Sequence, residues 1–203
     1  MRQTTPAIVL SLRLHGETGA VARFLTPELG LVAAYVRGAR GRRMRPVLVA
    51  GNAVEARLSA RTDAQLPQAE VELTHSRAPL MTEPLPAAGI LWATTVTAEV
   101  LPERQPYPSL YQGLDGLLDA IAAAPAARGW GPALLAYELL LLAELGFGLE
   151  PALVERAAGD WLAGLDLTGR RVRRDLLQRP GEPAWDARER LTARLRRAHG
   201  LVA

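Results

Sequence analysis

The chain has 203 residues, of which 49% are hydrophobic and 22% charged, so we expect a packed core in one large or two small domains. Its 24 lysine-plus-arginine positions are all arginine, and it lacks cysteine. Its net charge of +3 divides into +6 over residues 1–60, +1 from Arg61, −9 over 62–160 and +5 over 161–203. This composition excludes a disulfide scaffold, a cysteine-ligated zinc site, a thiol nucleophile, a Schiff-base lysine and a P-loop lysine.

The N-terminal part reads as short strands separated by turns. The segments combine β-branched residues with partial or full alternation of polar and apolar positions. They are residues 7–14, 21–26, 31–36, 54–58 and 69–73. Five short strands with glycine-containing turns, and no pattern of helical length, predict a five-stranded OB-fold barrel.

From about residue 79 the hydrophobic period becomes helical. One apolar face repeats at helical spacing through Leu110, Leu114, Leu117, Leu118 and Ile121. Residues 85–101 predict a further helix. Residues 133–145 are apolar nearly all round, with Pro132 at a plausible first helical position, and predict the central helix of a bundle. The fold class is therefore α+β, with an OB-fold domain over residues 1–78 and an α-helical bundle domain over 79–203.

The C-terminal tail is basic and divergent in pattern. Residues 165–172 are consistent with a hairpin around Thr168 and Gly169, and residues 186–199 predict a helix rich in arginine. The tail also carries a second basic cluster, formed by Arg170, Arg171, Arg173 and Arg174. Two interpretations of this cluster stay open: it extends a path for DNA, or it solvates the hairpin.

The sequence offers little for catalysis or metal binding. His15, His75 and His199 are scattered, and no Gly-x-Ser-x-Gly nucleophile motif occurs. Glu138 is a candidate general acid or base because its helix is apolar, but a structural carboxylate that pairs with an arginine or a helix end is the favoured interpretation. We therefore expect no enzyme activity, catalytic residue, metal or cofactor. No apolar window approaches the length of a membrane span, so we expect a cytoplasmic, nucleoid-associated protein with no membrane contact.

The strongest chemical signal is an arginine loop. Five arginines fall within nine residues with no acid among them, namely Arg37, Arg40, Arg42, Arg43 and Arg45. These guanidinium groups repel one another unless a polyanion is present, and each can donate two parallel hydrogen bonds to a phosphate. Together with a five-stranded barrel, the loop predicts nucleic-acid binding. A solvated loop is the alternative.

Aromatic residues are scarce beside this loop. Tyr35 directly precedes it and is a candidate for stacking on a base, whereas Phe24 is expected in the core. So few stacking residues favour binding that is dominated by the phosphate backbone and indifferent to sequence.

Three segments resemble the bacterial DNA repair protein RecO family. They are GETGAVARFLTPELGLVAAYVRGARGRRMRP, EVLPERQPYPSLYQGLDGLLDAI and YELLLLAELGFGLEP, and they occur in the expected order up to about residue 150. The resemblance implies an oligonucleotide-binding barrel followed by a helical domain. It also implies a recombination mediator that binds single- and double-stranded DNA and anneals DNA strands coated by single-strand-binding protein.

The resemblance implies partners as well. RecO-like proteins act with RecR, hold the acidic C-terminal tail of the single-strand-binding protein and help load the RecA recombinase at gaps. Many members carry a four-cysteine zinc site, which cannot be transferred to this chain because it has no cysteine. Of the family's DNA contacts, only the arginine loop is carried over.

Two other functions stay open. One is a protein-interaction adaptor without intrinsic DNA binding, in which the basic loop is incidental. The other is an RNA-binding accessory factor, since this class of barrel does not by itself distinguish the two sugars.

Overall fold

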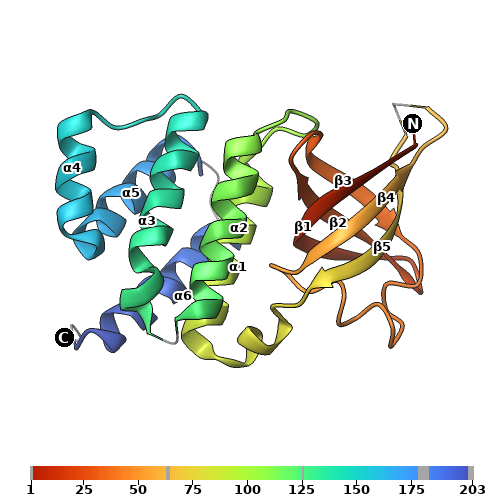
Figure 1. The fold of residues 1–203 in the computed structure, drawn as a ribbon, viewed down its shortest axis with the longest axis horizontal. Helices are drawn as coiled ribbons and strands as arrows, with labels where there is room; N and C mark the ends of the chain where they lie inside the picture. Colours follow the sequence, from red (N-terminus) through yellow and green to blue (C-terminus); the bar gives the residue numbers. More distant parts are fainter. Residues whose placement is uncertain (1, 63–64, 125, 178–182, 201–203) are drawn as a thin grey trace. The chain divides into compact units, whose positions relative to one another are not determined.

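A computed structural model describes residues 2–62, 65–124, 126–177 and 183–200. Within these ranges, five strands are followed by one short 3₁₀ helix (η1, Ala78–Thr82) and six α-helices (Figure 1). The chain divides into two compact units, residues 1–82 with 97–111 and residues 83–96 with 112–203. The predicted α+β class is confirmed, and the strands are consistent with an OB-fold. The division into domains after residue 78 stays a prediction.

The five strands close into a ring. Their order is β1-β2-β3-β5-β4, and β4 pairs back onto β1. Each neighbouring pair is antiparallel except β3 and β5, which are parallel and meet at Tyr35 and Gln68. The strands span β1 Arg2–His15, β2 Gly19–Thr26, β3 Gly30–Val36, β4 Ala53–Ser59 and β5 Gln68–His75. All five strands expected from the sequence are therefore present, each longer than its pattern indicated.

A small apolar core fills the ring. Phe24 and Val9 are fully buried there and are surrounded by several alanines. A five-stranded ring encloses a narrow interior, and alternate residues of each strand point into it. The placement of Phe24 in the core is confirmed.

The turn between β2 and β3 is held from two sides. The Thr26 hydroxyl donates to the Gly30 carbonyl at 3.1 Å and accepts from the Leu29 amide at 3.1 Å. Gly30 has a φ of +68°, and a Cβ at this position would lie 1.8 Å from the carbonyl oxygen of Gln105. Residues 97–111 thus belong to the first unit because they pack directly on this turn.

The same segment covers part of β2 and β3. The Arg104 amide donates to the Leu31 carbonyl at 2.9 Å. Arg23 donates to Glu103 at 2.8 Å and to the Ala98 carbonyl at 2.6 Å. One end of the β2–β3 surface is therefore occupied by the chain itself, and the opposite end, toward the arginine loop, is not covered by this segment.

Helices make up most of the second unit. They span α1 Pro84–Val100, α2 Pro108–Ala123, α3 Ala127–Glu144, α4 Pro151–Gly159, α5 Trp161–Asp175 and α6 Pro183–Ala198. The helices expected at residues 85–101, 133–145 and 186–199 are confirmed, and α2 carries the apolar face that contains Leu110 and Leu114. Among the described helices, not one combines the length and hydropathy needed to span a bilayer.

Two local predictions were wrong. Helix α3 begins at Ala127, so Pro132 lies inside the helix and not at its first position. Residues 165–172 form part of α5 and not a hairpin. Asp160 caps α5 by accepting from two backbone amides at 3.1 Å, and a Cβ at Gly169 would lie 2.9 Å from Nη2 of Arg188. Gly169 therefore serves a close helix contact and not a turn.

A buried ion pair joins four helices of the second unit. Glu138 on α3 is fully buried and accepts from Arg188 on α6, from Thr168 on α5 and, at 2.7 Å, from the indole of Trp92 on α1. Arg188 also donates to the Leu165 carbonyl and lies 5.0 Å from the centre of the Trp92 ring. The expectation that Glu138 is a structural carboxylate paired with an arginine is confirmed.

Burial and pairing act on Glu138 in opposite directions. Burial raises the pKa of the Glu138 carboxyl, and the Arg188 guanidinium and the hydrogen bonds from Thr168 and Trp92 lower it by less. The Glu138 carboxyl is positioned to hold the helices together, because its hydrogen bonds come from side chains of three other helices.

Replacing Glu138 alone should destabilise the protein more than replacing the whole pair. Glu138→Gln leaves the buried Arg188 charge without its counterion, which costs about 3–5 kcal/mol of unfolding free energy. Glu138→Gln combined with Arg188→Met removes both charges and should recover a large part of that loss. Urea unfolding of wild type, Glu138→Gln, Arg188→Met and the double variant measures the coupling, and losses that add in the double variant would contradict it.

Gly30 should tolerate a methyl group far less well than Gly16 does. Both have nearly the same left-handed φ, +68° and +66°, but a Cβ at Gly16 meets nothing within 4 Å. We expect Gly16→Ala to cost about 1–2 kcal/mol from backbone strain alone. Gly30→Ala should cost about 1–3 kcal/mol more, because Gln105 must move. Equal losses in urea unfolding would show that the Gln105 contact contributes nothing.

Candidate nucleic-acid interface

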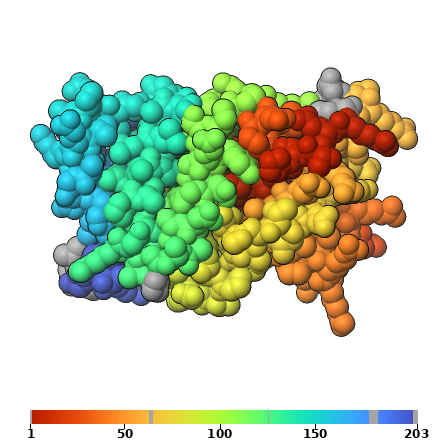
Figure 2. Space-filling view, in the orientation of Figure 1, coloured from red at the N-terminus to blue at the C-terminus, as the bar shows by residue number. Residues whose placement is uncertain are grey.

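The arginine loop connects β3 to β4 and presents its charges to solvent. Arg37, Arg40, Arg42, Arg43 and Arg45 are all exposed. Their apolar neighbours Ala39 and Leu48 are 2% and 5% exposed and belong to the core of the ring. Figure 2 shows this loop in orange, with side chains that project from the surface of the first unit. The arginines point outward because the loop is anchored by its apolar residues.

Two of the five arginines hold the loop in shape. Arg40 donates from its side chain to the Glu17 carbonyl at 2.9 Å and from its amide to the Thr18 carbonyl at 3.2 Å. The Arg45 side chain donates to the Arg40 carbonyl at 2.9 Å. Gly38, at a φ of +67°, allows the tight turn that begins the loop. The loop is thereby fastened to the turn between β1 and β2.

The side chains of the other three arginines do not hold the loop in shape. Arg37, Arg42 and Arg43 make neither a hydrogen bond nor an ion pair with any residue that the structure describes. An unpaired guanidinium group can donate to a phosphate without first giving up an internal hydrogen bond or ion pair. These three are the strongest candidates for contact with nucleic acid.

Tyr35 is held in place by the β1–β2 hairpin. Its ring meets the ring of His15 edge-on, with centroids 6.1 Å apart and planes at 85°. A Cβ at Gly19 would lie 2.1 Å from the Tyr35 hydroxyl, so only glycine leaves room for the ring. The sequence predicted Tyr35 as a stacking residue but gave no sign that His15 lies beside it. A stacking role for Tyr35 stays a prediction.

A groove of about 600 Å³ is lined by the loop and by strands β4 and β5. Apolar side chains of the loop and of β5, Met44, Val47 and Leu73 among them, also line it. Tyr35, Arg37 and Arg43 line it, and Arg40, Arg42 and Arg45 do not. The opposite lining comes from the outward residues of two strands, Glu55, Arg57, Glu70 and Glu72. The structure thus brings three of the predicted residues together with one arginine and three acids that the sequence did not place beside the loop.

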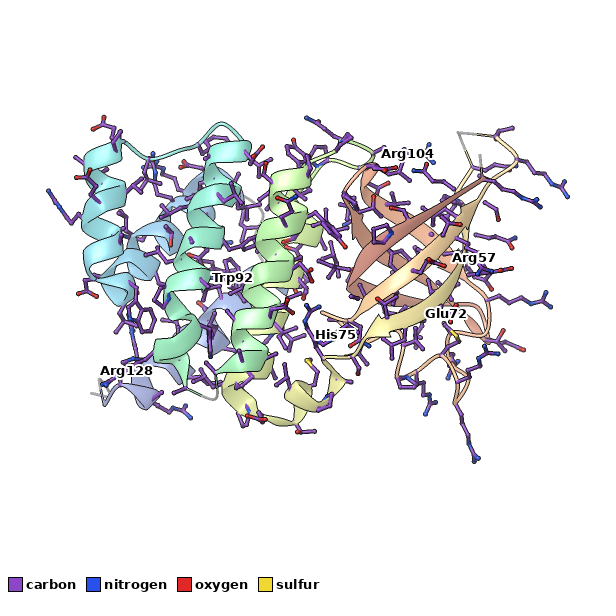
Figure 3. All side chains as sticks on the ribbon, viewed as in Figure 1. Arg57, Glu72, His75, Trp92, Arg104 and Arg128 are labelled. Carbon is purple, nitrogen blue, oxygen red and sulfur yellow. The ribbon has the colours of Figure 1, made fainter. Side chains whose placement is uncertain are left out.

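The alternation in β4 and β5 already indicated that these side chains point outward. What the sequence lacked was the register between the strands, which decides which charges are neighbours. Figure 3 shows Arg57 on β4 and Glu72 on the neighbouring β5.

The second basic cluster lies on α5 and has partners of its own. Arg171 and Arg174 lie 3.6 and 2.6 Å from Asp175, and Arg173 lies 5.1 Å from the ring centre of Trp185 on α6. Hydrogen bonding to Arg174 lowers the pKa of the Asp175 carboxyl. Arg170 is exposed. A role of this cluster in a DNA path stays a prediction, and its location on a hairpin was wrong.

Metal ligation finds no support in the geometry. In the part of the chain with described coordinates, no group of three or more histidine and acidic residues is placed to hold a metal ion.

Comparison with known proteins places both parts of the chain in one family. The family model "Recombination protein O N terminal" matches residues 1–77, and "Recombination protein O C terminal" matches residues 82–151. The first match covers the ring of strands and the arginine loop.

Several curated proteins are similar over most of the chain. The DNA repair protein RecO of Caulobacter sp. (strain K31) is 40% identical over 181 residues, which are 89% of this chain and 72% of that protein. Those of Bradyrhizobium sp. (strain ORS 278) and Rhodospirillum centenum are 44% and 41% identical over 151 residues, 74% of this chain and 59% of each relative. The chain therefore spans between 59% and 72% of the length of these relatives. On these matches, the chain belongs to the RecO family.

Proposed function

We propose that this protein is a non-enzymatic mediator of DNA repair and recombination that binds and anneals DNA. Membership of the RecO family supports the general role in DNA repair. The observation that carries DNA binding is the ordered arginine loop, in which Arg37, Arg42 and Arg43 are exposed and unpaired among the described residues.

Annealing follows from charge neutralisation. Two complementary strands repel each other through their phosphates, and a loop that offers several guanidinium groups lowers this repulsion without a nucleotide cofactor. Because the loop is held by Ala39 and Leu48 in the core, its charges are already gathered before DNA arrives. Less ordering is then needed on binding.

The partners proposed for this chain come from the family resemblance. They are RecR, the acidic C-terminal tail of the single-strand-binding protein and, indirectly, RecA, which the protein would help to load on coated gaps. An arginine-rich C-terminal segment, +5 over residues 161–203, offers basic side chains that suit an acidic tail.

Removing the three unpaired arginines should weaken single-stranded DNA binding and its dependence on salt. In Arg37→Ala/Arg42→Ala/Arg43→Ala, the loss of three phosphate contacts reduces the slope of log K against log salt by about 2. The ratio of wild-type affinity to variant affinity should then fall about 20-fold as salt rises from about 50 to 200 mM. Fluorescence anisotropy with a labelled oligonucleotide measures both quantities, and the same variant should anneal complementary strands more slowly.

A matched control removes three exposed arginines from the helices. Arg128→Ala/Arg156→Ala/Arg190→Ala has the same change in net charge and leaves the loop intact. It should keep the wild-type slope. If the loop variant keeps wild-type affinity and slope, the loop does not bind DNA and a protein-interaction adaptor becomes the better description. Stronger binding to a matched RNA oligonucleotide would favour the RNA-binding alternative.

A further inference from the structure

The groove beside the arginine loop has walls of opposite charge, and this points to how a single strand lies in it. We propose that the phosphates contact Arg37 and Arg43 while the bases face the carboxylates of β4 and β5. In this arrangement the groove favours bases that carry an exocyclic amino group over thymine. The inference rests on the proposed function and specifies the bases that the same site accepts.

Strand register sets the carboxylate wall. Glu55 on β4 is directly opposite Glu72 on β5, and Arg57 is directly opposite Glu70. All four side chains are exposed, and all four line the groove. Side chains opposite each other in an antiparallel pair are near neighbours, so Glu55 and Glu72 present their carboxylates side by side.

These carboxylates are available to a ligand. Neither the Glu70 nor the Glu72 side chain forms a hydrogen bond or an ion pair with a residue in the described ranges. The Arg57 and Glu55 side chains approach only to 3.9 Å and are 61% and 47% exposed, which is too long for a hydrogen bond. Like charges placed directly opposite each other are unfavourable, and a ligand group that donates to both relieves the repulsion.

The arginines on the loop side of the groove determine which way the phosphates of the strand face. Carboxylates repel phosphates, whereas Arg37 and Arg43 are exposed guanidinium groups without internal partners among the described residues. A single strand in this groove therefore lies with its backbone toward the loop and its base edges toward β4 and β5. Tyr35 lines the same groove and offers a ring beside the path.

Hydrogen-bonding chemistry then separates the bases. An ionised carboxylate accepts hydrogen bonds and donates none. The amino group of cytosine is a donor that acidic side chains accept from, and adenine also presents an amino group. Thymine has two carbonyl oxygens in place of the amino group, and its single ring N3–H lies between them, so a carboxylate that accepts from this N–H is also repelled by the two oxygens. Cytosine and thymine are both pyrimidines, so comparing them isolates the amino group from differences in ring size.

The experiment compares oligo(dC) with oligo(dT) of the same length, about 16 nucleotides, on the full chain at neutral pH. Fluorescence anisotropy should show wild-type binding to oligo(dC) about fivefold tighter than to oligo(dT), at the lower end of the discrimination expected for base-edge contacts because the groove is open. In Glu55→Gln/Glu72→Gln, whose amides both donate and accept, the preference should shrink because Glu70 is the one carboxylate left among the groove's lining residues, and oligo(dT) affinity should rise.

The matched control is Glu150→Gln/Glu155→Gln, which removes two exposed acids from the α4 region and should keep the preference for oligo(dC). Urea unfolding checks that the groove variant is folded, and it should be at least as stable as wild type because the repulsion between Glu55 and Glu72 is gone. If binding depends on the loop arginines but oligo(dC) and oligo(dT) bind equally well, this inference alone is overturned. A preference for oligo(dC) that is undiminished in the groove variant overturns it as well. Absence of single-strand binding overturns the proposed function and this inference together.

Discussion

Closure of the five-stranded ring is the constraint on which the candidate site depends. Ile8 pairs with Leu25 on β2 and also with Ala53 on β4, so β1 bends from one neighbour to the other and the ring closes on a single strand. A slip of one residue anywhere would turn polar side chains into a narrow core of alanine, valine and phenylalanine. Closure therefore fixes the outward row to which Tyr35, Glu55 and Glu72 belong, and with it the walls of the groove.

Arginine has two different structural roles in this chain. In the first unit, arginines of the loop stay in solvent, since neighbouring apolar residues supply the anchor. In the second, Arg188 is 4% exposed and is compensated by a carboxylate, a carbonyl and an aromatic ring. A chain without lysine thus uses the same side chain as a surface charge for a polyanion and as an internal tie between helices.

Much of the fold could be predicted from the sequence, because alternation and helical spacing are local signals. All five strands and the helices at residues 85–101, 133–145 and 186–199 followed from them. Pairing between distant residues could not be predicted. Glu138 was expected to meet an arginine, yet nothing local selected Arg188, fifty positions away. The hairpin was mispredicted since Thr168 and Gly169 resemble a turn, although Thr168 donates to Glu138 and Gly169 leaves room for Arg188. In the site, the arginine loop could be predicted, but not that acids of β4 and β5 lie beside it, because register is a property of the closed ring.

The packing of residues 97–111 on the β2–β3 turn also bears on how the protein can be dissected. A fragment that stops at residue 78 would contain every strand and the whole arginine loop, yet it would lack Gln105 behind Gly30 and Glu103 beside Arg23. Its ring would expose surface that is covered in the intact chain. The unit that holds the strands is thus compact in space but is built from two separate stretches of sequence. A fragment meant to contain all of it should extend beyond Tyr111.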